Sequence, residues 1–163
     1  KNPDDLQAAM MLALINQNRG KVTDAKKVYT YILEKDPKNA LAANNMAWIL
    51  AQDGTGNDLN EALRLAQIAK DKFPEDPRIA DTLGYVYFKK GLVENALAQF
   101  QLATERLPDD PSVNYHTALA LAELKRGNEA VDYLQKAMNT KTDFEEKTSA
   151  QELLARLKAE NKE

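Results

Sequence analysis

The stretch Ala80-Asp-Thr-Leu-Gly-Tyr-Val-Tyr-Phe-Lys-Lys-Gly91 decides the fold, together with a second stretch that runs on to Pro108. Small residues recur in these stretches at intervals of four and seven, which places them on one side of a helix. Two helices with small facing residues can approach closely, while a larger side chain fills the flanks. The stretch therefore predicts a helical hairpin broken near Gly91 and ended by Pro108. The residues that carry this packing are Ala80, Gly84, Ala96, Phe100 and Ala103.

The same hairpin recurs along the chain with a period of 34 residues. Linker prolines are separated by 34, 37 and 34 residues, and lie at Pro3, Pro37, Pro74 and Pro108. A series of alanines repeats at intervals of the same two lengths, at Ala25, Ala62, Ala96 and Ala130. The three extra residues fall in the segment 53–58, DGTGND, which has the composition of a turn. Such fixed spacing indicates stacked copies of one supersecondary unit.

The repeated unit resembles the tetratricopeptide repeat, a 34-residue helix-turn-helix module. The fourth copy has Lys125 where the turn glycine is expected and Thr142 where the proline is expected, so we interpret it as the degenerate, terminal copy. The resemblance implies an all-α fold, a right-handed α-α superhelix of four helical hairpins plus a C-terminal capping helix. Inside the first hairpin it places Leu12 and Ala13.

The domain organisation follows from this register. Leu153 and Leu157 recur at helical spacing among charged residues, as expected for a helix that covers the last hairpin. We expect residues 1–5 to be the linker of a preceding repeat, the first copy to lack an N-terminal cap, and the chain to be the C-terminal piece of a longer array. The predicted copies span 6–39, 40–76, 77–110 and 111–142, followed by a capping helix and tail over 143–163.

Composition argues against several classes of protein. With 22 basic and 25 acidic residues the formal net charge is −3, which gives no general attraction to nucleic acid or anionic lipid. The charged residues also interrupt every apolar run that could span a membrane. The chain has no cysteine and one histidine, so thiolate chemistry, disulfides and a histidine-rich metal site are excluded within it.

Catalysis and metal binding find little support in the motifs. There is no glycine-rich phosphate loop and no His/Glu pair with metal-ligand spacing. The segment 53–58 offers oxygen ligands for calcium, but it occurs once, and Arg64 stands where an EF-hand needs a glutamate. We therefore predict a longer turn there, no metal, no cofactor and no enzymatic activity.

By the resemblance, function lies on a concave groove formed by the first helix of each hairpin, expected at about 6–18, 40–52, 77–89 and 111–124. In tetratricopeptide proteins this groove receives a peptide segment of a partner protein. The residues that the resemblance places on it are Asn44, Asn45, Trp48, Arg78, Asp81, Tyr85, Phe88, Tyr115 and His116.

The aromatic members of this set carry the functional prediction. Trp48, Tyr85, Phe88 and Tyr115 are rigid side chains of the kind that anchor binding partners. The alternative is that they fill contacts between adjacent hairpins.

The polar members of the set also allow two interpretations each. Asn45 matches an asparagine that in many family members reaches the backbone of an extended peptide; the alternative is a solvated groove residue. Arg78 matches one member of a basic clamp for a C-terminal carboxylate, but the rest of that clamp is absent. His116 is either a pH-sensitive contact or an ordinary polar contact.

Our leading hypothesis is therefore a non-catalytic scaffold that binds an extended or helical segment of another protein in the groove. The alternative is an assembly module that spaces other parts of a complex or self-associates through its uncapped start, around Leu6, Met10 and Met11, without a groove ligand. The stretches 44–48 and 81–88 are similar to bacterial repeat proteins of envelope, secretion and exopolysaccharide systems. No targeting segment is visible, which leaves bacterial cytoplasm, periplasm and cell envelope open.

Overall fold

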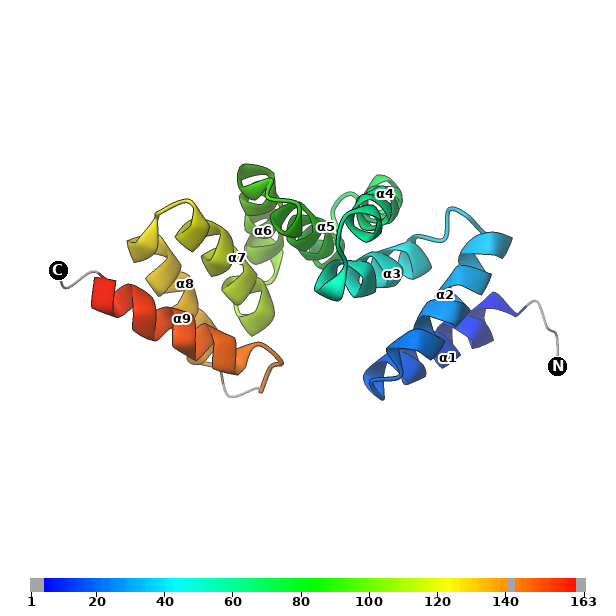
Figure 1. The fold of residues 1–163 in the computed structure, drawn as a ribbon, viewed down its shortest axis with the longest axis horizontal. Helices are drawn as coiled ribbons and strands as arrows, with labels where there is room; N and C mark the ends of the chain where they lie inside the picture. Colours follow the sequence, from blue (N-terminus) through cyan, green and yellow to red (C-terminus); the bar gives the residue numbers. More distant parts are fainter. Residues whose placement is uncertain (1–4, 141–142, 161–163) are drawn as a thin grey trace. The chain divides into compact units, whose positions relative to one another are not determined.

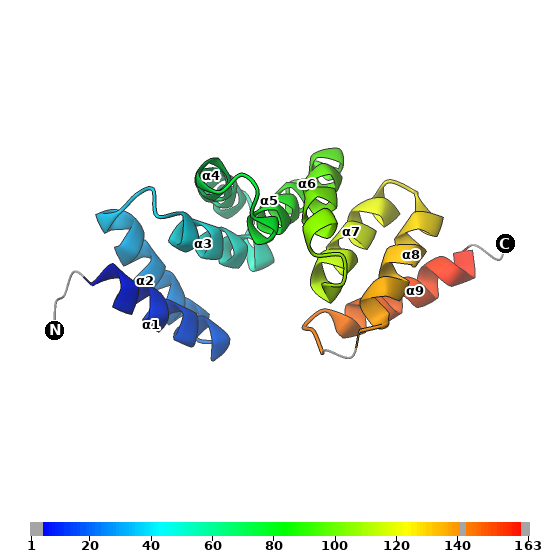
Figure 2. The same ribbon diagram turned by 180° about the vertical axis from the view of Figure 1, so that it is seen from behind.

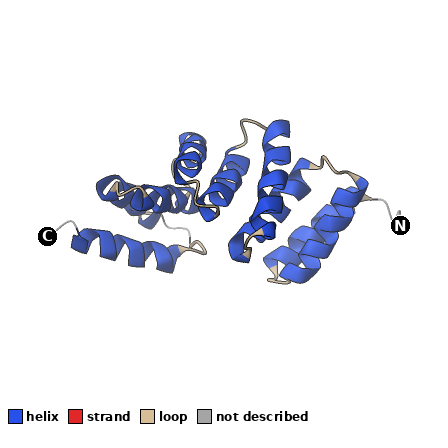
Figure 3. Ribbon diagram, turned by 45° about the horizontal axis from the view of Figure 1, so that its top comes forward, coloured by secondary structure: helices blue, strands red, loops and turns tan. Residues whose placement is uncertain are grey.

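The computed structural model describes residues 5–140 and 143–160, except for the side chain of Asp53. Over these residues every regular element is a helix (Figure 3), which confirms the predicted all-α fold. Most of the predicted linker 1–5, Thr142 and the last residues of the predicted tail lie outside the described ranges. The helices are α1 (Leu6–Asn18), α2 (Val22–Lys35), α3 (Ala40–Asp53), α4 (Asn57–Lys72), α5 (Pro77–Lys89), α6 (Val93–Arg106), α7 (Pro111–Glu123), α8 (Gly127–Met138) and α9 (Lys147–Glu160).

Short polar linkers set where the first helix of each hairpin begins. Asp76 accepts a hydrogen bond from the backbone N–H of Arg78 at 2.9 Å, and Asp110 accepts one from Val113 at 3.0 Å. Asp5 and Asn39 cap α1 and α3 in the same way. These carboxylates and this amide satisfy N–H groups that have no partner inside the helix. The linkers thus start the helices within one residue of the predicted positions.

The turns inside the first, third and fourth hairpins share a left-handed backbone conformation at one residue. Gly20 and Gly91 have φ of 70° and 75°, and Lys125 has φ of 61° at the corresponding place in the fourth hairpin. This left-handed conformation is favourable for glycine and strained for other residues. The fourth turn therefore keeps its geometry although its sequence departs from the pattern. In the second hairpin α3 ends at Asp53 and α4 begins at Asn57, so the predicted turn is present.

The chain divides into two compact units, Lys1–Glu75 and Asp76–Glu163, called here the N-terminal and the C-terminal unit. In the N-terminal unit α1 pairs with α2, α3 pairs with α4, and α2 also packs on α3 (Figure 1). Its buried side chains include Tyr29 and Ile32 of α2 and Ile49 of α3. Leu12 is 50% exposed, so its predicted place inside the first hairpin is wrong, whereas Ala13 is buried as predicted.

In the C-terminal unit α5 pairs with α6, α7 with α8, and α9 packs on α8 (Figure 2). A close approach of two helices occurs at Gly84, where an added Cβ would lie 2.6 Å from the ring of Phe100. This is the close packing of small residues that the sequence predicted. Leu153 and Leu157 of α9 complete the core with Leu121 and Leu134 of the hairpin α7/α8, which is the covering role predicted for the tail.

Candidate functional site

The predicted groove residues are distributed over both compact units. Asn44, Asn45 and Trp48 lie on α3 of the N-terminal unit. The C-terminal unit carries Arg78, Asp81, Tyr85 and Phe88 on α5, and Tyr115 and His116 on α7. We therefore describe the two sets separately.

In the N-terminal unit the amides form a chain of hydrogen bonds with Tyr29. The Tyr29 hydroxyl donates to Gln17 Oε1 at 2.8 Å and has a side-chain hydrogen bond with Asn45. Asn44 Nδ2 donates to Asn45 Oδ1 at 3.5 Å. Burial raises the pKa of Tyr29, and the bond with Asn45 partly opposes that rise. The hydrogen bond between Asn45 and Tyr29 thus joins α3 to α2. Trp48 is half-buried.

In the C-terminal unit the predicted residues surround one buried histidine. His116 is 1% exposed, and its Nδ1 lies 2.9 Å and 3.1 Å from the two carboxylate oxygens of Asp81. The ring centres of Tyr85 and Tyr115 lie 5.1 Å and 5.9 Å from that of His116. Tyr115 itself is 8% exposed. Asp81, Tyr85, Tyr115 and His116 therefore come together as a packed cluster, with the imidazole at its centre and away from solvent.

A second carboxylate faces the other side of the imidazole. Nε2 of His116 lies 3.5 Å from Glu146 Oε1, and Glu146 Oε2 accepts a hydrogen bond from Ser112 Oγ at 2.9 Å. Burial alone lowers the pKa of His116, but Asp81 and Glu146 together outweigh it and raise that pKa to about 10. A pKa raised this far favours the doubly protonated ring at neutral pH, and that form has no lone pair for a metal ion.

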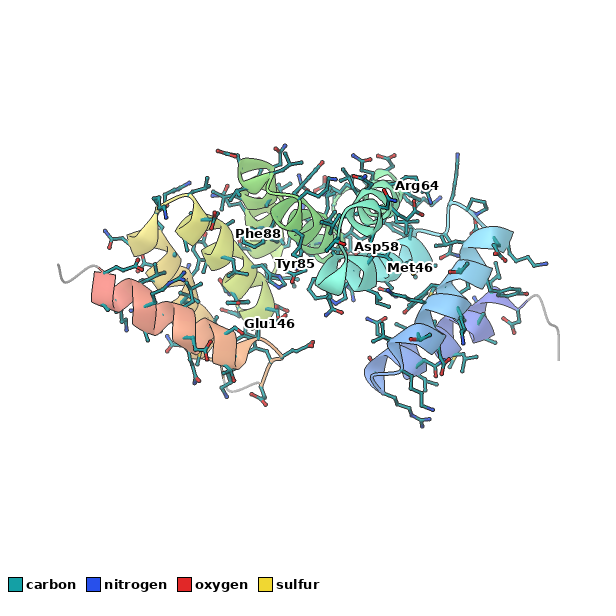
Figure 4. The ribbon with its side chains drawn as sticks, viewed as in Figure 1. Met46, Asp58, Arg64, Tyr85, Phe88 and Glu146 are labelled. Atoms are coloured by element: carbon teal, nitrogen blue, oxygen red, sulfur yellow. The ribbon has the colours of Figure 1, made fainter. Side chains whose placement is uncertain are left out.

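Phe88 lies in an open depression lined by α5, α7, the α7–α8 turn and α9. Its volume is about 390 Å³, and both apolar and charged side chains line it. A neighbouring hollow of about 280 Å³ shares Leu119, Leu153 and Arg156 with it. We call the two together the α7–α9 trough. In Figure 4 the labelled Phe88, Tyr85 and Glu146 lie along one side of the C-terminal unit. The apolar lining of the larger depression, called here the floor, consists of Phe88, Leu119, Ala122, Leu153 and Leu157, and its charged lining, called here the rim, consists of Glu123, Lys125, Arg156 and Glu160.

The site residues of the segment 143–160 were missed from the sequence. Extending the 34-residue period beyond the fourth hairpin pairs Ser112 with Glu146, Tyr115 with Ser149 and Leu119 with Leu153. Ser112 and Tyr115 hydrogen-bond to these partners, and Leu119 lines the trough with Leu153. The helix α9 thus occupies the place of a fifth first helix. The 34-residue period, continued past the fourth hairpin, was the sequence signal that could have predicted the contacts of Glu146 and the lining of the trough.

No helix within the two described ranges combines the length and apolar character needed to cross a membrane.

Arg78, the remaining residue of the predicted groove, has an exposed side chain whose Nε lies 3.6 Å from Oδ1 of Asp76 at the start of α5.

Comparison with known proteins gives matches of several kinds. A family model described as the TT21 fifth ARM repeats domain matches residues 6–106, and a tetratricopeptide repeat model matches residues 82–141. TPR repeat-containing protein PA4667 of Pseudomonas aeruginosa is 27% identical over 66% of this chain and 18% of its own length. Protein FlbA of Caulobacter vibrioides is 32% identical over 70% of this chain and 19% of its own length.

A similar fold is present among solved structures. The TPR protein TTC0263 of Thermus thermophilus superposes with a TM-score of 0.71, at 20% identity, over 97% of this chain and 82% of that one. The chain spans about a fifth of the length of the curated relatives that it matches. The repeat spacing, the paired helices and these matches agree, and the chain belongs to the tetratricopeptide repeat family.

Proposed function

We propose that the chain is a non-catalytic protein-interaction module whose C-terminal unit binds a peptide segment of a partner protein in the α7–α9 trough. The observation that carries this proposal is the trough itself. Its apolar floor can bury aliphatic or aromatic side chains, and its charged rim can orient the backbone around them. Membership of the tetratricopeptide family supports a binding role, because these repeats commonly serve protein recognition.

The trough shares one aromatic anchor with the groove predicted from the sequence. Phe88 lines the floor, while Tyr85 and Tyr115 pack around His116. We propose that Phe88 and Leu119 make the main apolar contacts with the ligand, and that the N-terminal set of Asn44, Asn45 and Trp48 forms a separate peptide contact. The N-terminal set is the weaker candidate, because the Asn45 side chain already bonds to Asn44 and Tyr29.

Peptide binding in the trough is expected to weaken at least about tenfold in Leu119→Glu and Phe88→Ala, because each removes apolar contact area from the floor. The probe is a peptide selected with the wild-type chain from a displayed random library, and its Kd is measured by fluorescence anisotropy.

The matched control is Leu102→Ala. Leu102 is 44% exposed on α6 of the same unit and does not line the trough. Selected peptides that bind Leu119→Glu and Leu102→Ala with the same Kd as the wild type would show that the trough is not the binding site.

The second candidate function is self-association through α1. Met11, Leu12 and Ile15 are 64%, 50% and 45% exposed there. The residue 34 positions after Ile15 is Ile49, which is 3% exposed and packs in the cluster that includes α2. At Ile15 the face of α1 therefore matches a position that α3 buries, and an exposed apolar face favours pairing.

If α1 pairs with a second copy, sedimentation velocity shows a wild-type coefficient that rises with protein concentration. Ile15→Glu is then expected to remain monomeric, since it places a carboxylate in the paired face. Leu41→Glu, at a 55% exposed residue of α3, serves as the control and should behave as the wild type. A wild-type chain that stays monomeric at all concentrations would exclude this function for the chain alone.

A further inference from the structure

We propose that Asp81, His116 and Glu146 form an ionic latch that closes α9 onto α7, and that opening this latch removes one wall of the α7–α9 trough. The latch is a property of the fold and stands without a ligand. Only its effect on binding rests on the proposed function.

The three residues come from three separate elements. Asp81 lies on α5, His116 on α7, and Glu146 in the turn directly before α9. Glu146 is fixed at that place by its own backbone, because its carbonyl accepts from the N–H of Ala150 at 2.9 Å in the first turn of α9. A displacement of α9 at this end therefore moves the Glu146 carboxylate, and a fixed carboxylate holds the start of α9.

The ring of His116 is the central charge of the latch. Facing groups are Asp81 and Tyr85 from α5, Phe100 from α6, Tyr115 from α7 and Glu146 before α9. The side chains of Asp81 and Glu146 are 14% and 20% exposed, so water screens the pairs only in part. A charge buried to this degree needs both partners, because a ring left with one carboxylate is incompletely compensated. The closed position of α9 supplies the second partner.

Apolar packing holds α9 independently of the latch. Ala150, Leu153 and Leu157 belong to the core of the C-terminal unit, and Ser149 has a hydrogen bond with Tyr115. Loss of the latch should therefore loosen the start of α9 without unfolding the hairpins. The same helix contributes Leu153, Arg156, Leu157 and Glu160 to the lining of the trough. A loosened α9 holds these residues less firmly against α7, which weakens the contacts that a ligand in the trough makes with α9.

The charges give the latch a defined dependence on pH. Because the pKa of His116 rises from 6.5 to about 10 in the folded state, its contribution is complete below pH 6.5 and is lost as pH rises toward 10. The bonds with His116 and Ser112 lower the pKa of Glu146 despite its burial, so its contribution is present above its ordinary pKa of 4.5 and is lost as pH falls below it. The latch is therefore strongest between about pH 4.5 and about pH 6.5, where both contributions are present.

Hydrogen exchange of the α9 amides tests the latch without any ligand. In Glu146→Gln, which keeps an oxygen for Ser112 but removes the charge, we expect protection factors over 147–160 to fall at least about fivefold, with those of α5 and α6 unchanged. The control is Glu145→Gln, which removes an exposed carboxylate from the neighbouring position. In the wild type, protection of α9 should fall as pH rises toward 10, by at most about tenfold per pH unit, because His116 keeps only Asp81 when α9 is open. This slope should be absent in His116→Gln.

Two results would overturn the latch. One is equal protection of α9 in Glu146→Gln and Glu145→Gln. The other is wild-type protection of α9 that stays constant as pH rises through about 10. If His116→Gln fails to fold, Glu146→Gln and the wild-type pH series still decide the matter.

The selected peptide separates the latch from the proposed function. Opening of α9 in Glu146→Gln with an unchanged Kd for the peptide would support the latch and contradict the trough as the binding site. Opening with a Kd raised at least about fivefold supports both.

Discussion

Phe100→Ala is expected to lower the free energy of unfolding by about 3–5 kcal/mol, the range found when a fully buried aromatic side chain is truncated. Phe100 is 0% exposed and lies against Gly84, whose missing side chain forms the slot that the ring fills. Its ring centre is also 5.7 Å from that of His116, so truncation removes packing from the buried charge. Urea denaturation followed by far-UV circular dichroism measures the change.

The control for Phe100→Ala is a truncation on the exposed side of the same helix. Leu102→Ala should change the free energy of unfolding by less than about 1 kcal/mol, because Leu102 is 44% exposed. Gly84→Ala should destabilise the wild type by about 1–3 kcal/mol and Phe100→Ala by much less, since the added methyl group enters the vacated slot. Equal effects of Phe100→Ala and Leu102→Ala would contradict the packing described here.

Leu157→Asp is expected to lower the free energy of unfolding by about 3 kcal/mol or more, because it buries a carboxylate without a partner. Leu157 is 5% exposed in the core cluster that contains Leu121 and Leu134 of the last hairpin. If α9 detaches to bring this carboxylate into water, the helix no longer covers the apolar residues of the last hairpin. Exposed apolar surface should then increase the binding of a hydrophobic dye.

Lys158→Asp is the matched control for Leu157→Asp. It introduces the same side chain at the next residue of α9, which is exposed. We expect a change of less than about 1 kcal/mol and no added dye binding. Leu157→Asp that unfolds at the same urea concentration as Lys158→Asp would show that α9 contributes little to the stability of the C-terminal unit.

The helical fold was predictable because its determinants are local and repeat. Small residues at Gly84 and Ala96 specify a close crossing, and the linker acids Asp76 and Asp110 specify where α5 and α7 begin. Leu12 was predicted inside its hairpin but is 50% exposed, whereas Leu83 at the same place in α5 is 4% exposed. The first helices of the later hairpins have more of their surface covered than α1 has within the described residues.

The candidate site was predictable only in part, because it depends on contacts between residues far apart in sequence. The repeat register placed Asp81 and His116 on neighbouring first helices, but it does not say that their side chains pair. His116 also faces Glu146 in the turn before α9, a segment that the sequence predicted only as part of a covering helix and tail. A charged residue such as Glu146 beside a capping helix is usually solvated, and its pairing with a histidine 30 positions earlier requires the folded structure.

The turn between α3 and α4 offers a practical route to labelling the protein. The turn runs over 54–56, and Thr55 and Gly56 within it are exposed. Since the chain contains no cysteine, Thr55→Cys introduces a unique thiol. An exposed turn position tolerates substitution better than a packed helix face does. A fluorophore coupled there would report on the N-terminal unit from outside its core, and would leave Trp48 as a second, intrinsic probe of the same unit.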